Sequence, residues 1–246
     1  MWNWHSGNAI AHPILDLVTT PLSPTPRSTL GRHADRARIE RAELYDVLDA
    51  CLVGHLGVTM DGAPVVLPTG YGRIGDTLYL HGSTGASTLR AAARGAPVCF
   101  TVTCVDGVVY ARSVFAHSMN FRSAVVHGTV RQVTDDAERL QGLAALTEHL
   151  APGSWGHARL PDRKELAATT VLALDLTEAS VKVRRGPPGD AEQDVPADGD
   201  PDAPWAGVLP VRTVFGAPQP DARVAPAGSV PAHVQRRAAA GLSPSA

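Results

Sequence analysis

The stretch that decides the fold class runs His55-Leu-Gly-Val-Thr-Met60, Asp61-Gly62, and then Pro64-Val-Val-Leu-Pro-Thr-Gly-Tyr71. Polar and apolar residues alternate in its first part, which is typical of a half-buried β-strand. Asp-Gly is among the pairs most favoured for a two-residue hairpin turn. The stretch therefore predicts two antiparallel strands joined by a tight turn.

The same alternation continues along the chain. It predicts further strands at 77–81, 97–105, 108–115, 124–133, 171–176 and 180–184, with tight turns at Gly75-Asp76 and Asp106-Gly107. Apolar residues at helical spacing predict one or two helices over 35–52 and others over 88–94 and 135–150, the last capped by Asp135. We therefore expect an α+β fold, mainly β, built around an antiparallel barrel with a few flanking helices. The helix–strand alternation and the Gly-rich fingerprint of a Rossmann fold are missing from the sequence.

Proline-rich ends frame this pattern. Residues 1–26 are predicted to be a disordered N-terminal arm, 27–215 the barrel domain, and 216–246 a disordered Pro/Ala-rich tail. Within the domain, 186–204 is expected to be a loop and 205–210 a short apolar island.

The composition excludes several classes of protein. With 246 residues, a net charge of -2 and a pI near 6.5, the chain has no basic footprint for nucleic acid. It has no apolar run long enough for a membrane span and no signal-like start, so we expect a cytoplasmic protein without membrane contacts. The three cysteines, Cys51, Cys99 and Cys104, fit no metal motif and are expected to be buried, reduced thiols.

The segment His81-Gly-Ser-Thr-Gly-Ala-Ser-Thr88 lies at the end of a predicted strand and the start of a predicted helix. Unpaired N–H groups at a helix N-terminus, two glycines and four hydroxyls form the kind of site that an anion or phosphate requires. A plain helix cap is the competing interpretation.

A second polar segment, Ser118-Met-Asn-Phe-Arg-Ser-Ala124, lies between apolar β-strands. Arg122 could clamp a phosphate or carboxylate, and Ser118 and Asn120 could bind a polar ring edge. On spacing alone, a surface loop is an equal alternative.

The histidines His55, His81, His117 and His127 match no helical metal pair, and the default for each is a hydrogen-bonded structural role. His81 is the exception, because it ends a strand beside the predicted phosphate segment. We expect it to be the best proton donor in the chain.

Four motifs occur in a fixed order: Arg36 with its following helix, Tyr79-Leu-His-Gly-Ser-Thr-Gly85, Ser118-Met-Asn-Phe-Arg-Ser123 and Trp205-Ala-Gly-Val-Leu-Pro210. Over about 27–212 this order resembles the flavin-nucleotide-binding proteins related to pyridoxamine 5'-phosphate oxidase, in the branch that includes the 5-nitroimidazole reductases.

The resemblance implies an FMN-binding split β-barrel that holds FMN at a homodimer interface. It implies cofactor contacts from the following residues: Val66, Leu67, Pro68, Thr69, His81, Gly82, Ser83, Thr84, Ser87, Thr88, Ser118, Asn120, Arg122 and Ser123. His81, as the expected proton donor, is the candidate catalytic residue. No metal is expected. Two positions depart from the family: Ala86-Ser87 stands where many relatives carry a Lys or Arg for the phosphate, and Phe121 replaces a common Tyr.

The function implied is an FMN-dependent oxidoreductase of a small molecule, with a nicotinamide or deazaflavin as possible electron donor. The alternatives are a non-catalytic flavin carrier or sensor, and a barrel that binds haem or a deazaflavin.

Overall fold

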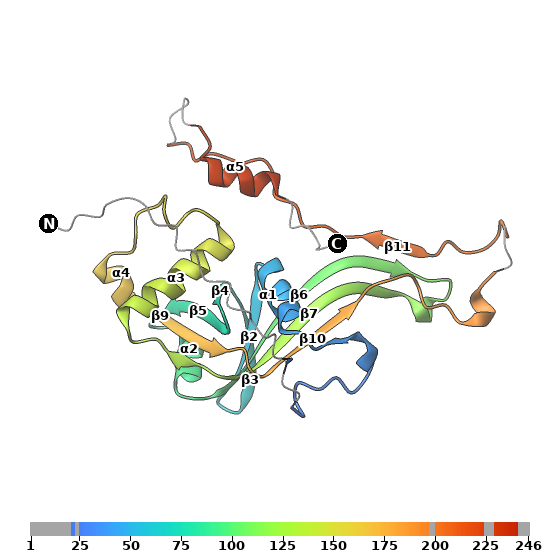
Figure 1. Ribbon diagram of the computed structural model, residues 1–246, viewed down its shortest axis with the longest axis horizontal. Coiled ribbons are helices and arrows are strands. Elements are labelled where there is room, and N and C mark those ends of the chain that lie inside the picture. The colour runs from blue at the N-terminus through green and yellow to red at the C-terminus, as the bar shows by residue number, and fades with distance from the viewer. Residues whose placement is uncertain (1–20, 23–24, 197–199, 224–228, 241–246) are drawn as a thin grey trace.

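The structure, a computed structural model, describes residues 21–22, 25–196, 200–223 and 229–240. Most of the expected N-terminal arm and parts of the expected tail lie outside the described residues. Figure 1 shows two antiparallel sheets that meet in a barrel, with helices on its outside. The expected α+β, mainly β, split-barrel fold is confirmed.

The larger sheet has seven strands, all antiparallel. Its order is β1 (Ala37–Arg38), β10 (Ala179–Arg184), β7 (Ser118–Thr129), β6 (Pro97–Tyr110), β2 (Gly54–Met60) and β3 (Ala63–Thr69), and β11 (Gly207–Pro210) also pairs with β6. The expected hairpin is present, with Met60 opposite Ala63 and positive φ angles of 49° at Asp61 and 78° at Gly62.

The smaller sheet has four strands, in the order β4 (Tyr71–Ile74), β5 (Thr77–Ser83), β9 (Thr169–Asp175) and β8 (Arg131–Gln132). The helices are α1 (Arg41–Ala50), α2 (Ser87–Ala93), α3 (Asp136–Leu150), α4 (Arg163–Ala168) and α5 (Ala232–Ala239), with single 3₁₀ turns at Ala34–Arg36, Val114–Ala116 and Glu192–Asp194. As expected, the side chain of Asp135 caps α3 by accepting a hydrogen bond from the Glu138 N–H.

The core lies between the two sheets and under α1 and α3. Its largest fully buried side chains are Tyr71, Phe100, Leu44, Leu48, Leu56, Leu78, Leu80, Leu172, Leu174 and Leu176. Helix α3 approaches β4 very closely: a Cβ on Gly72 would lie 2.4 Å from the backbone of Ala145 and Leu146. Glycine is therefore required at this contact.

Strand β6 differs from expectation, because no hairpin turn forms at Asp106-Gly107. The strand is continuous and carries a β-bulge between Val105 and Gly107. Asp106 is the extra residue of the bulge. It shifts the alternation by one position, so that Val109 after the bulge is buried, as Val102 is before it. Gly107 serves a close contact instead of a turn, since a Cβ there would lie 2.8 Å from Val208 on β11.

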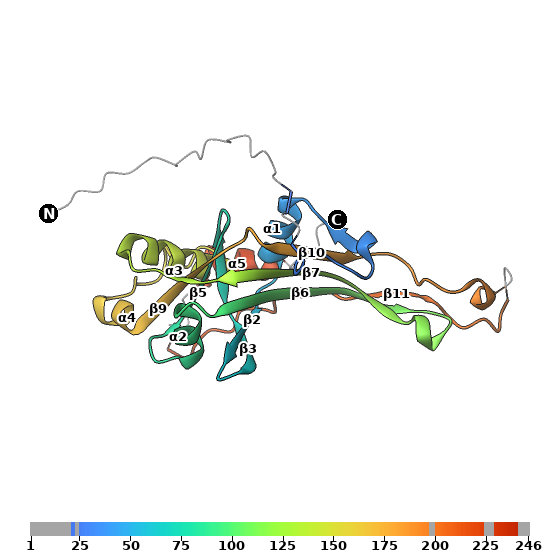
Figure 2. The ribbon, with the colours of Figure 1, turned by 90° about the horizontal axis from the view of Figure 1, so that it is seen from below.

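Strand β7 also differs: it begins at Ser118, so the segment 118–123 is strand and not loop. Together β6 and β7 form a long arm that extends well beyond the barrel, with the turn Val114–Ala116 at its tip (Figures 1 and 2).

Both ends of the described chain are more ordered than the sequence predicts. Leu22, expected in the disordered arm, is 7% exposed, and its N–H donates to the Ile39 carbonyl. In the expected tail, α5 places His233 against His157, with ring centroids 4.8 Å apart. Residues 1–20 and 241–246 lie outside the described residues.

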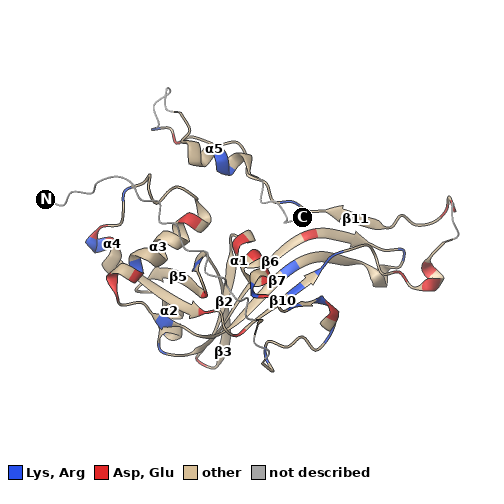
Figure 3. Cartoon of the chain, in the orientation of Figure 1, with Lys and Arg blue, Asp and Glu red and all other residues tan. Residues whose placement is uncertain are grey.

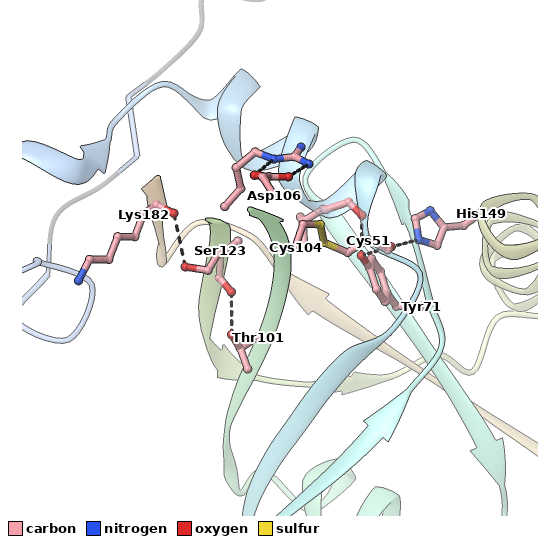
Figure 4. Close-up of a disulfide and its surroundings, with 11 residues drawn as sticks. Cys51, Tyr71, Thr101, Cys104, Asp106, Ser123, His149 and Lys182 are labelled. Carbon is pink, nitrogen blue, oxygen red and sulfur yellow. Dashed lines mark hydrogen bonds and ion pairs between the residues drawn. A yellow bond between two sulfur atoms is a disulfide. The ribbon is translucent and has the colours of Figure 1, made fainter. Parts of the chain in front are cut away.

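The expectation of three reduced thiols is wrong for two of them. Cys51, at the end of α1, and Cys104, on β6, form a disulfide with a Cα–Cα distance of 6.2 Å (Figure 4). Cys99 is free and half-buried. The pairing joins positions 53 residues apart, and only the packing of α1 against β6 brings them within reach.

Candidate functional site

One side of the seven-stranded sheet is exposed and combines apolar and hydroxyl side chains. His55 on β2 is paired with Pro68 on β3 and with Thr101 on β6, and Thr103 is paired with Ser123 on β7. Directly paired residues point to the same side of a sheet. We call this side the outer face; it is formed by His55, Val66, Pro68, Thr101, Thr103, Ser123 and Val125.

The alternate residues of the same strands point into the barrel. Leu56, Phe100 and Val126 are paired across the three strands and are at most 2% exposed. This alternation fixes the direction of the outer face, because a slip of one residue would expose the core.

Strand β3 is the edge of the sheet and has no partner on its open side in the described part of the chain. Proline lacks an N–H, so Pro64 and Pro68 suit positions that face away from β2. Alternate residues of a strand direct their backbone groups to the same edge, so the N–H and C=O of Val66, between the two prolines, also point to the open edge. Val66 and Leu67 are 60% and 42% exposed, so apolar surface and free backbone groups occur together here.

The segment 81–88 joins β5 to α2 in a compact turn. The Ser83 hydroxyl accepts a hydrogen bond from the Gly85 N–H, and the Thr84 N–H donates to the Ala168 carbonyl. Gly82 is required because a Cβ there would lie 2.4 Å from Leu89 Cδ1. The N-cap residue, Ala86, has no side-chain acceptor for the first N–H groups of α2.

His81 lies on the other side of β5 from Gly82 and opens into a pocket of about 360 Å³ between α3 and α4. Apolar side chains dominate its wall, among them Leu143, Trp155 and Leu160. Burial lowers the pKa of His81, which favours the neutral imidazole. The structure therefore separates His81 from the first turn of α2, although the two are adjacent in sequence.

An ion pair stands at the rim of this pocket. Arg159 donates to both carboxylate oxygens of Glu165, at 2.9 and 2.7 Å. These bonds, with one from the Asp162 N–H, lower the pKa of Glu165 to about 2. Both residues are charged at neutral pH, so the pocket has an apolar wall and a charged rim.

The segment 118–123 divides between the two sides of the sheet. Met119, Phe121 and Ser123 point outward, whereas Asn120 and Arg122 point inward and are 8% and 6% exposed.

Each inward group of this segment already has a protein partner. Arg122 donates through Nε and Nη2 to the two carboxylate oxygens of Asp106, both at 2.9 Å. Asn120 accepts from Arg184 and donates to the Gly186 carbonyl.

The structure distributes the predicted site residues over several places. Val66, Pro68 and Ser123 share the outer face, and 82–88 joins β5 to α2. His81 lines its own pocket, and Ser118, Asn120 and Arg122 lie on the β7 part of the arm. Leu67 and Thr69 are opposite Leu56 and Gly54, on the other side of β3 from Val66.

Sequence reasoning missed His55, Thr101 and Thr103 as members of the outer face. The alternation of β2 and β6 contains the signal for these positions, because each of the three polar residues is next to a buried residue along its own strand.

His55 also lines a second pocket of about 360 Å³, together with the Cys51–Cys104 disulfide, Arg122 and Arg212. Among the described residues no cluster of three or more metal-ligating side chains occurs. Nor does any helix in the described ranges have the length and apolar character needed to cross a membrane.

Comparisons with known proteins agree with this architecture. The FAD- and haem-binding protein from Mycobacterium smegmatis is 42% identical over 84% of this chain and 98% of its own, with a TM-score of 0.78. The flavocytochrome Anf3 from Azotobacter vinelandii is 36% identical over 88% of this chain and 99% of its own, with a TM-score of 0.80. A candidate 5-nitroimidazole antibiotic resistance protein from Bacteroides thetaiotaomicron shares the fold at 21% identity, 60% and 86% coverage and a TM-score of 0.51.

A comparison with curated proteins found no match. The sequence profile of pyridoxamine 5'-phosphate oxidase matches residues 40–183, which include the hairpin, the segment 81–88 and the segment 118–123. The chain belongs to the pyridoxamine 5'-phosphate oxidase family.

Proposed function

We propose that this protein is a homodimeric flavin-binding redox protein, and that the outer face and the turn into α2 hold the flavin. The observation that carries the proposal is the similarity, over most of both chains, to two proteins described as binding FAD with haem or as a flavocytochrome. The sequence predicted FMN; we propose FAD, because the M. smegmatis relative is described as an FAD protein.

The outer face fits the flavin ring. Val66 and Pro68 offer an exposed apolar surface, and the open edge of β3 offers a backbone N–H and carbonyls to the polar edge of the ring. Ser123 and Thr103 stand on the same side and add hydroxyl groups.

The first turn of α2 fits the flavin phosphate. Ala86 leaves the leading N–H groups of the helix without a side-chain cap, and Ser87 adds an exposed hydroxyl. Because no Lys or Arg occupies 86–87, backbone and hydroxyl donors replace the charge that many relatives use.

A bound flavin supplies the electron and hydride chemistry. The residues of this chain would orient its ring on β3, donate hydrogen bonds to its phosphate at the start of α2 and exclude water from its apolar side.

The dimer is part of the proposal because the arm is apolar and exposed. Val114 and Phe115 at its tip are 87% and 99% exposed, and Met119 and Tyr110 behind them are 48% and 38% exposed. A second copy of the chain that packs on β6 and β7 would bury these side chains. Sedimentation at micromolar concentration should therefore show a dimer, and a stable monomer would count against it.

Absorbance spectroscopy with flavin titration tests the flavin site. Val66→Glu should lower flavin affinity at least tenfold, because it puts a charge on the apolar surface under the ring. Ile74→Glu is the matched control: Ile74 is 45% exposed on the other sheet, and flavin affinity should not change. Equal losses in both variants, or no flavin bands with the wild type, would contradict the proposal.

Turnover distinguishes the redox protein from a carrier. Bleaching of the bound flavin by a nicotinamide or deazaflavin donor, followed by reoxidation with a small-molecule acceptor, is the expected result. Flavin that binds and is never reduced would support the carrier or sensor alternative.

Haem binding is the second candidate activity, and the His81 pocket fits it. A haem iron needs a neutral imidazole with an apolar surround, and His81 has a lowered pKa beside Leu143, Trp155 and Leu160. Bound haem should give a Soret band that His81→Ala removes and that His117→Ala, on the arm, retains. A Soret band that survives His81→Ala, with flavin reduction lost, would return His81 to its predicted role as proton donor.

A further inference from the structure

A third pocket, of about 530 Å³, lies on the exposed side of α2. Ser87, Arg90 and Arg94 supply one wall, and Thr59 with Asp61 from the β2–β3 turn supplies the other. Ser87 and Arg90 lie three residues apart in α2, and Arg94 directly follows the last residue of the helix, so all three line the same side.

The two arginines are not used by the fold. Neither forms an ion pair or a side-chain hydrogen bond within the described ranges, whereas ten other arginines there do form ion pairs. Both are exposed, and Figure 3 shows blue, the colour of Lys and Arg, at α2, which contains Arg90. Against them stands one carboxylate in the pocket, Asp61, so the two guanidinium groups leave a net positive charge.

The position of the pocket is as informative as its charge. On one side it is lined by Ser87, which belongs to the predicted phosphate segment. On the other side it is lined by the turn that leads into β3, the strand on which the flavin ring is proposed to lie. A flavin whose first phosphate lies at Ser87 therefore has a cationic pocket beside that phosphate.

We propose that this pocket binds the adenylate half of FAD, with Arg90 and Arg94 gripping the phosphate that FAD carries and FMN lacks. The inference rests on the proposed flavin function and adds the residues that select between the two flavins. Planar guanidinium groups match phosphate oxygens bidentately, which explains why arginine serves here in a chain with only Lys164 and Lys182 as lysines.

Fluorescence titration with FAD and with FMN tests the inference on the full-length protein. Arg90→Ala with Arg94→Ala should lower FAD affinity about tenfold to a hundredfold, since charge-assisted hydrogen bonds are lost. FMN affinity should stay within twofold of wild type. Alanine favours helix, and both side chains are exposed, so α2 should fold as before.

Arg163→Ala is the matched control, because Arg163 is also exposed, helical and without an ion pair in the described ranges. Its affinities for both flavins should equal those of wild type. Arg90→Lys should bind FAD more weakly than the wild type and more tightly than the double alanine variant, because a lysine keeps the charge but loses the planar guanidinium group.

ADP distinguishes a flavin pocket from a site for a free nucleotide. FMN-loaded wild type should bind ADP, and the double variant should not. Equal losses of FAD and FMN affinity, no loss of either, or ADP binding without any preference for FAD over FMN would overturn the inference. Failure of the wild type to bind any flavin would overturn the proposed function, and this inference with it.

Discussion

Arg122→Ala should destabilise the fold far more than it weakens flavin binding. The sequence places Arg122 in a candidate cofactor motif, but in the structure two of its nitrogens donate to Asp106 at 2.9 Å. The pair joins β7 to the bulge of β6, next to the disulfide. Its removal leaves the Asp106 carboxylate without its main partner in a pocket of the protein.

The exposure of the two side chains sets the magnitude. The Arg122 side chain is 7% exposed and that of Asp106 is 17% exposed. Breaking a buried ion pair from one side costs roughly 3–5 kcal/mol, and we expect about 3 kcal/mol because Asp106 keeps some contact with water. Arg131 is the comparison: it pairs with Glu138, but its side chain is 59% exposed, so Arg131→Ala should cost less than about 1 kcal/mol.

Urea unfolding of the wild type, Arg122→Ala, Asp106→Asn and the double variant measures the coupling directly. The double variant should be less destabilised than the sum of the single variants by at least about 1 kcal/mol. A coupling below about 0.5 kcal/mol, or equal losses for Arg122→Ala and Arg131→Ala, would refute the structural role. A tenfold loss of flavin affinity in a folded, dimeric Arg122→Ala protein would place this side chain at the cofactor instead.

Three further predictions follow from single features of the structure. Replacing Cys51 and Cys104 together by serine should lower the free energy of unfolding by up to about 4 kcal/mol, from the 53-residue separation, and a reductant should lower it in the wild type alone. Gly72→Ala should cost several kcal/mol in urea unfolding or prevent folding, because a Cβ there meets the α3 backbone at 2.4 Å, whereas Gly70→Ala, with nothing within 4 Å, should not. Burial lowers the pKa of His149 from 6.5, so the unfolded state binds a proton more tightly than the folded state does, and the free energy of unfolding falls as the pH drops below about 6.5. His149→Gln should make this fall shallower. An unchanged pH profile in that variant would contradict the assignment.

Much of the fold could be predicted because its signals are local. The alternation around Asp61-Gly62 gives both strands of the first hairpin, and Asp135 marks the start of α3. The error at Asp106-Gly107 is instructive, since the same dipeptide can serve a turn or a bulge. Here β11, about a hundred residues later in the chain, packs closely against Gly107, and no local sequence pattern indicates that contact.

The cysteines and the termini illustrate a second limit. Cys51 and Cys104 come together because α1 packs against β6, and the Leu22 side chain is buried because it packs into the core of the completed fold. Contacts of this range depend on the completed fold. Proline density predicts weak local structure, but it does not predict whether a segment docks elsewhere.

The segment 118–123 shows how residues that the sequence groups in one candidate site divide between the two sides of a sheet. As a strand, it sends Ser123 to the outer face and Arg122 inward, so adjacent residues serve different purposes. The same rule on β5 sends Gly82 toward α2 and His81 toward the pocket under α3. Residues of one sequence motif therefore lie on the two opposite sides of a sheet. Residues that follow one another in the motif must be tested by different measurements, with unfolding free energy for those that point inward and flavin affinity for those that point outward.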